Sequence, residues 1–270
     1  MISGRLTACV FAGGATRVPG VPALGLAVQL YTLRARLADD LDQTLGALAA
    51  AGAREVELAG LYGRDGAAMR RALDAAGLTA CSAHVPLERF EREPDVVLEE
   101  AAALGVATVV VPSVPRPATA AEADAAVERI VAAAGVAGRA GLGFAYHNHD
   151  FEFRPLEGGG DFWSRITAAG LVHEPDVGWL QVAGRDPVAV LGELAGRVAL
   201  VHAKDVRRTP DGGWRDVVAG DGDLDWPAIA AAAAAAGASR LVVELDNPSA
   251  DPIDDVARSL ATLRAVTSAS

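Results

Sequence analysis

EVELAGLYGRDGAAMRRALDAAGLTACSAH, residues 55–84, contains the unit that decides the fold. Residues 55–58 and 79–84 are short apolar and β-branched runs, which predict buried strands, and residues 66–76 between them have the spacing of a helix. Gly77 follows this helix directly, where glycine provides the left-handed cap that ends it. Strand, helix and strand in this order predict two parallel strands joined by a crossover helix.

The same unit recurs along the chain at a spacing of about 30 residues. Strands are predicted at residues 24–30, 55–58, 79–84, 108–112, 142–147, 171–176, 199–203 and 240–245. Helices are predicted at residues 39–51, 66–76, 96–104, 120–140, 187–194, 226–236 and 254–266. Eight units with no linker between them predict a single α/β domain, a (β/α)8 TIM barrel, over residues 23–270.

Two features of the first 22 residues bear on this prediction. Gly13 and Gly14 precede the first predicted strand, so the glycine fingerprint of an open dinucleotide-binding sheet is absent. Arg5 followed by a short apolar stretch resembles a secretory leader, and a disordered start explains the same residues. We therefore expect residues 1–22 to be disordered or leader-like and to lie outside the barrel.

Composition and charge exclude several classes of protein. The formal net charge of -11 repels phosphate backbones, which argues against a nucleic acid partner and gives no support to a membrane-surface role. No apolar run approaches the roughly 20 residues of a spanning helix. The two cysteines, Cys9 and Cys81, form neither a disulfide framework nor a paired metal motif, which is typical of a cytoplasmic protein.

Histidines and carboxylates gather where the predicted strands end. The chain has five histidines, and four of them lie at these ends: His84, His147, His149 and His202. His173 is the exception, and a surface position would explain it. Asp176 and Glu244 also end predicted strands. Because the carboxyl ends of barrel strands meet at one mouth, a His, an Asp, a His and a Glu from strands five to eight can converge on one point.

Mixed imidazole and carboxylate ligands suit Mn²⁺, Zn²⁺, Co²⁺ or Fe²⁺. Mg²⁺ is less suited to two imidazoles, because it prefers oxygen ligands. The sequence thus predicts one divalent metal ion, with Mn²⁺ as the expected ion and Zn²⁺, Co²⁺, Fe²⁺ or Mg²⁺ as alternatives.

The chain resembles the sugar phosphate isomerase/epimerase family of the xylose isomerase-like barrels from about residue 24 onward. The motifs that carry the resemblance are VQLYTLR (28–34), VELAG (56–60), YHNHDFEF (146–153), DVGW (176–179), HAKD (202–205), GDG (220–222) with LDW (224–226), and VE (243–244). In that family the metal is commonly held by Glu, Asp, His and Glu from strands five to eight. The resemblance implies Asp176, His202 and Glu244 as ligands here, with His147 in the place of the first Glu.

Strand alternation puts His147 and His149 on the same face, so the sequence leaves open which of them is the strand-five ligand. We expect His147 to ligate and His149 to contact substrate or act as a base. Glu57 and the ligand-side Glu244 are the other candidate bases. Gln29, His84, Asn148 and Lys204 are the candidate substrate contacts. Each has a structural alternative, since amides also bind backbone and Glu57 can pair with a buried Arg.

The leading hypothesis is a metal-dependent isomerase or epimerase of a sugar or keto-sugar, acting through an enediolate. A lyase or dehydratase on a keto-inositol or 3-keto-glycoside shares the first step and is the close alternative. A non-catalytic sugar-binding barrel is the third possibility, and the complete ligand set argues against it. A metal-dependent abasic-site nuclease needs a basic face that this chain lacks. The expected partner is a small-molecule sugar, and homodimer formation stays open.

Overall fold

Residues 55–84 fold as the sequence predicts. The strands β2 (Glu55–Ala59) and β3 (Thr79–His84) pair in parallel, and helix α3 (Gly66–Ala76) connects them. Gly77 ends this helix in the left-handed region, at φ 71°. Asp65 begins it, because its side chain accepts a hydrogen bond from the Ala68 backbone N–H.

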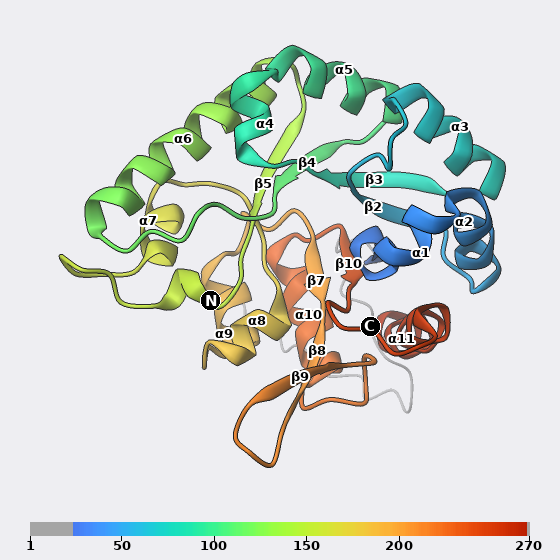
Figure 1. Cartoon of the computed structure of the whole chain (residues 1–270). Helices are drawn as coiled ribbons and strands as arrows, with labels where there is room; N and C mark the ends of the chain where they lie inside the picture. Colours follow the sequence, from blue (N-terminus) through green and yellow to red (C-terminus); the bar gives the residue numbers. More distant parts are fainter. Residues whose placement is uncertain (1–23, 269–270) are drawn as a thin grey trace, which may run out of the picture.

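The computed structural model describes residues 24–268, and in this range eight parallel strands form a nearly closed barrel (Figure 1). The remaining strands of the barrel are β1 (Gly25–Gln29), β4 (Thr108–Val111), β5 (Gly143–His147), β6 (His173–Glu174), β7 (Val201–Ala203) and β10 (Arg240–Val243). Their order in the sheet is β6-β5-β4-β3-β2-β1-β10-β7. The sequential parallel order is that of a (β/α)8 barrel, which confirms the predicted fold class.

Helices surround this barrel, and α3, α5 and α6 form the upper arc in Figure 1. Besides α3, the helices are α1 (Arg34–Asp39), α2 (Leu41–Ala50), α4 (Leu87–Arg92), α5 (Pro94–Leu104), α6 (Ala120–Arg139), α7 (Phe162–Ala168), α8 (Val177–Val182), α9 (Pro187–Glu193), α10 (Trp226–Ala236) and α11 (Pro252–Ser268), with the 3₁₀ turns η1 (Leu30–Leu33) and η2 (Phe151–Phe153). The apolar core lies between these helices and the strands. No helix among residues 24–268 is long and apolar enough to span a bilayer.

The barrel has a seam between β6 and β7. These two strands share no continuous ladder and are joined by two isolated parallel bridges, His173 to Val198 and Asp176 to His202. Pro175 follows β6 directly and has no N–H to continue a ladder. This is why β6 is two residues long where the sequence predicted a strand over residues 171–176.

Two further features differ from the sequence prediction. An antiparallel hairpin of β8 (Asp205–Arg208) and β9 (Trp214–Val217) follows β7 and projects at the lower edge of Figure 1. His173 is fully buried, so a surface position is wrong; its ring packs on Trp163 at 4.7 Å between centroids. Burial lowers the pKa of His173 to about 3, so the ring is packed in its neutral form. The prediction for residues 1–22 lies outside the described residues.

Candidate metal centre

The four predicted ligands converge at the carboxyl ends of their strands. His147 is the last residue of β5, Asp176 follows β6, His202 lies in β7 and Glu244 follows β10. All four are buried, and their donor atoms lie within 4.8 Å of one another. We call these four residues the aspartate set.

Local structure holds Asp176 so that one carboxylate oxygen points into the site. Asp176 is the N-cap of α8, and its Oδ1 accepts a hydrogen bond from the Trp179 backbone N–H at 2.9 Å. Its own backbone N–H donates to Oδ1 of Asn148 at 3.1 Å. Asp176 Oδ2 is buried and accepts no hydrogen bond. Burial raises the pKa of Asp176 to about 7, and the nearby Lys204 ammonium opposes this rise.

His147 is also buried with a nitrogen that makes no hydrogen bond. This nitrogen, Nδ1, lies 3.3 Å from Oε2 of Glu174. Burial and the neighbouring His202 hold the pKa of His147 well below its ordinary value, so the ring is neutral. A neutral imidazole with an unpartnered nitrogen is the form that binds a metal ion.

His202 stands between carboxylates on both sides. Its Nδ1 lies 2.8 Å from Glu244 Oε2, and its Nε2 lies 2.7 Å from Glu57 Oε2 and 3.1 Å from Glu174 Oε2. Burial disfavours a charged ring, but Glu174 and Glu244 raise the pKa of His202 well above its ordinary value. In the absence of a cation, this ring supplies the positive charge that its acidic neighbours require.

Lys204 is a buried cation rather than a surface lysine. Its Nζ lies 3.3 Å from Asp176 Oδ2 and 3.1 Å from Glu244 Oε2, and it donates a hydrogen bond to Asp246. The ring of Trp179 covers it at 5.0 Å. Burial opposes the charge, but the carboxylates of Asp176 and Glu244 raise the pKa of Lys204, so it stays protonated.

The stretch at residues 146–153 positions His149. The Glu152 carboxylate accepts hydrogen bonds from the Tyr146 hydroxyl and from the His149 backbone N–H, both at 2.9 Å. The His149 ring lies 5.1 Å from the His147 ring, and its Nδ1 has no hydrogen-bond partner. Burial and then Lys204 lower the pKa of His149 to about 4. Asn148 is fully buried and bonds backbone through both amide atoms, which fixes Asp176.

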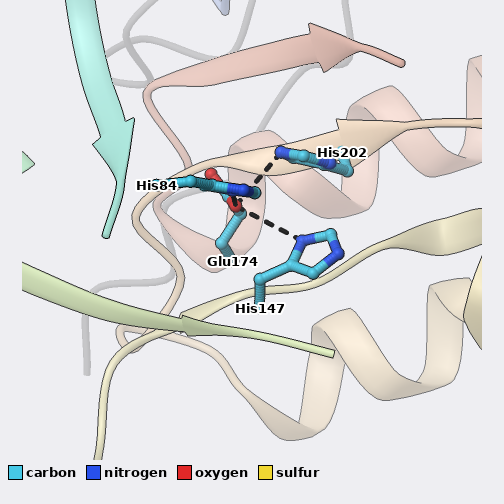
Figure 2. A group of neighbouring side chains, drawn as sticks. All are labelled: His84, His147, Glu174 and His202. Atoms are coloured by element: carbon cyan, nitrogen blue, oxygen red, sulfur yellow. Dashed lines mark hydrogen bonds and ion pairs between the residues drawn. The ribbon is translucent and has the colours of Figure 1, made fainter. Parts of the chain in front are cut away.

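Gln29, Glu57 and His84 lie on the other side of His202. Gln29 donates to Glu57 Oε2 at 2.8 Å and accepts from the Tyr31 backbone N–H. His84 Nε2 lies 3.1 Å from Glu57 Oε2 and 2.9 Å from Glu174 Oε2. In Figure 2 the Glu174 carboxylate lies among the rings of His84, His147 and His202.

Glu174 was not among the site residues predicted from the sequence. The signal was present, because residues 174 and 176 lie on the same face of an extended chain and residue 173 on the opposite face. Alternation from Asp176 therefore directs Glu174 into the barrel mouth and His173 out into the helix layer. Pro175 obscured this pattern, since it marks the end of the strand rather than its middle.

A cavity of about 760 Å³ opens beside the aspartate set. Trp179, Lys204 and Leu245 form its wall toward the site, and the hairpin contributes Arg207 and Trp214. Volumes of this size hold small-molecule ligands. Lys204 is thus the predicted site residue that lies both among the carboxylates and on the cavity wall.

Known proteins with sequences or structures similar to this chain share its barrel. Residues 45–266 match the family model described as a xylose isomerase-like TIM barrel. The rhizopine catabolism protein MocC of Rhizobium meliloti is 29% identical over 224 residues, which cover 70% of this chain and 69% of that protein.

Two solved structures illustrate the likeness in fold. A sugar phosphate isomerase/epimerase from Parabacteroides distasonis is 24% identical and superposes with a TM-score of 0.79, covering 95% of this chain and 99% of that one. An L-ribulose 3-epimerase is 16% identical with a TM-score of 0.64, covering 91% of this chain and 95% of that one.

Proposed function

Because the chain belongs to the xylose isomerase-like TIM barrel family, we propose that it is a metal-dependent isomerase or epimerase of a sugar or keto-sugar. The observation that carries the proposal is the aspartate set, in which two imidazoles and two carboxylates converge within 4.8 Å. Asp176 Oδ2 and His147 Nδ1 support it, because each is buried and makes no hydrogen bond, which is rare for buried polar atoms. Each has one longer contact at 3.3 Å, Asp176 Oδ2 with the Lys204 ammonium and His147 Nδ1 with the Glu174 carboxylate.

The donor set fits a first-row divalent cation. Two imidazole nitrogens with two carboxylate oxygens suit Mn²⁺, Zn²⁺, Co²⁺ or Fe²⁺ better than Mg²⁺, and we propose Mn²⁺ as the working ion. The two negative charges of Asp176 and Glu244 match the charge of such a cation. When bound, the ion would polarise a substrate carbonyl and its adjacent hydroxyl and so acidify the carbon between them.

His149 is the proposed base that moves the proton. Glu57 Oε2 already faces Gln29, His84 and His202, and Glu244 Oε2 faces His202 and Lys204. His149 Nδ1 has no hydrogen-bond partner, and the Glu152 carboxylate holds the backbone of His149 in place. A positioned base of this kind contributes about 10²–10⁴-fold to the rate of proton transfer.

Lys204 is the proposed substrate contact. Lys204 lines the cavity, and its ammonium group would donate to a sugar oxygen by exchanging one of its three carboxylate contacts. Trp179 lies against both Lys204 and His149 and would exclude water from this side. Gln29 and Asn148, whose amides are occupied by Glu57 and by backbone, would act by fixing their neighbours.

A lyase that uses the same first proton abstraction is the second candidate. The cavity of about 760 Å³ beside Lys204 favours it, because this space would accommodate the departing part of a larger keto-glycoside. A product lighter by water or by a sugar unit would identify a lyase, whereas an isomerase leaves the mass unchanged.

Metal analysis of the purified protein tests the proposal. We expect stoichiometric metal in the native protein and a loss of at least tenfold in metal affinity in Glu244→Gln. Glu193→Gln, at the exposed end of α9, is the matched control and should keep its metal. Candidate keto-sugars incubated in D₂O should gain deuterium at carbon with the native protein. Unchanged metal affinity in Glu244→Gln would remove Glu244 from the ligand set.

A further inference from the structure

Four side chains next to the aspartate set form a closed ring of short contacts. His84 Nε2 lies 3.1 Å from Glu57 Oε2 and 2.9 Å from Glu174 Oε2, and His202 Nε2 lies 2.7 Å and 3.1 Å from the same two oxygens. We call Glu57, His84, Glu174 and His202 the glutamate ring. Figure 2 shows three of its members together with His147.

Protonated imidazoles can balance the charge of the two glutamates, but they satisfy the hydrogen bonding of this ring poorly. Each Nε2 carries one hydrogen at most, yet each faces two carboxylate oxygens. The second oxygens, Glu57 Oε1 and Glu174 Oε1, are buried and have no hydrogen-bond partner. Both glutamates have no exposed surface, so two carboxylates are buried with their Oε2 atoms turned toward the same two nitrogens. Buried charges of this kind are paired or coordinate metal ions.

The spacing of the donor atoms matches a coordination shell. Two neighbouring donors that each lie about 2.1 Å from one cation are separated by about 3 Å in an octahedral shell and by about 3.4 Å in a tetrahedral one. The four nitrogen–oxygen separations in the ring run from 2.7 to 3.1 Å. A fifth donor, His147 Nδ1, lies 3.3 Å from Glu174 Oε2. Two or three imidazoles with two carboxylates again suit Mn²⁺, Zn²⁺, Co²⁺ or Fe²⁺.

We propose that the glutamate ring is a second divalent cation site, held by Glu57, His84, Glu174 and His202 and adjacent to the aspartate set. The proposal adds a second ion to the proposed metal-dependent function and shares His202 with it. His202 presents Nε2 to the glutamate ring and Nδ1 to Glu244, so its ring would join the two sites. With both sites filled, His202 would release both of its ring protons to solvent, since each ring nitrogen would then face a cation.

The test is the number of ions bound per chain, measured by elemental analysis after equilibration with excess Mn²⁺ or Zn²⁺ and removal of free ion. We expect two ions in the native protein, one in Glu174→Gln and one in Asp176→Asn. Anomalous diffraction from Zn²⁺-loaded crystals should show the ion that Glu174→Gln keeps at the aspartate set. It should show the ion that Asp176→Asn keeps at the glutamate ring. The retained ion in each variant demonstrates that the variant is folded.

Each other outcome is decisive. One ion per native chain, unchanged in Glu174→Gln, overturns the second site and leaves the proposed function standing. One ion that is lost in Glu174→Gln and kept in Asp176→Asn overturns the two-cation centre and assigns the single ion to the glutamate ring instead. No bound ion in the native protein overturns both proposals. His84→Gln is the second variant for the ring and should also reduce the count from two to one.

Discussion

Glu152 is a carboxyl group that the fold buries between Tyr146 and the His149 backbone, with Asp150 as the nearby acidic group. Burial raises the pKa of Glu152 to about 7, against 4.5 for the free side chain. The folded protein therefore holds this proton more tightly than the unfolded chain. Its contribution to stability is fully present below pH 4.5 and is lost as the pH rises to about 7.

Glu152→Gln should remove this pH dependence, because an amide resembles the protonated acid and can still donate to Tyr146 and accept from His149. The native free energy of unfolding should fall by about 3 kcal/mol relative to the variant between pH 4.5 and 7.5. Urea titrations of both proteins at each pH measure it. A constant difference across this range would show that Glu152 is ionised in the folded protein throughout.

Among single residues, those at the ends of strands were predicted well from the sequence. Residues whose place depends on contacts with distant strands were predicted less well. His147, Asp176, His202 and Glu244 meet because parallel strands deliver their last residues to one mouth. Pro175 hid the alternation that directs Glu174 into the mouth, and the contacts of Glu174 with His84 and His202 across the barrel had no signal of their own. Such contacts depend on the register of distant strands, which local sequence does not contain.

The element that supports the site from outside is the loop that follows the β8–β9 hairpin. Asp205 Oδ2 accepts hydrogen bonds from the backbone N–H groups of Gly220 and Gly222 and from Nε1 of Trp226. A Cβ on Gly222 would clash with the Asp205 carboxylate and lie 2.7 Å from the Val206 carbonyl oxygen. The backbone must approach this closely for the carboxylate to tie the hairpin to α10.

Gly222→Ala should therefore destabilise the protein by about 2–4 kcal/mol, through strain and loss of buried hydrogen bonds to a charged group. Gly46→Ala is the matched control. Gly46 lies in α2, and an added Cβ there meets nothing within 4 Å. The control should be neutral or more stable by up to about 1 kcal/mol. Thermal unfolding of the two variants compares them, and equal melting temperatures would contradict the role given to Gly222.

Helices and strands with a clear period of apolar residues were predicted accurately. The helices α3 and α10 and the strand β3 have the predicted bounds. The hairpin of β8 and β9 was not predicted from the sequence. Its strands β8 and β9 are four residues each, and Arg207, Arg208 and Arg215 interrupt any apolar alternation. Short exposed strands are stabilised by pairing with each other, so neither segment carries a signal alone.

At the scale of the whole molecule, the aspartate set crosses the one weak seam among the described strands. His147 lies on β5 and Asp176 after β6, on one side of the seam, while His202 lies on β7 and Glu244 after β10, on the other side. Few backbone hydrogen bonds join the two sides, among them His202 N–H to Pro175 O at 2.9 Å and Ala199 N–H to His173 O at 2.9 Å. One ion bound by all four residues would hold the barrel closed.

Metal removal should consequently loosen the seam rather than the whole barrel. An ion present at about 100 times its dissociation constant stabilises the closed state by about 2.7 kcal/mol. The backbone amides of Ala199 and His202 should then exchange with D₂O about 100-fold faster after chelation, whereas those of β2 and β3 change little. Asp176→Asn is the control: its seam should exchange faster than the native seam before chelation and should show a smaller acceleration on chelation, because it has already lost the ion of the aspartate set. Equal acceleration of amide exchange across β2, β3 and the seam would mean that the ion stabilises the whole barrel. Unchanged exchange at the seam would show that the ion does not hold the barrel closed there.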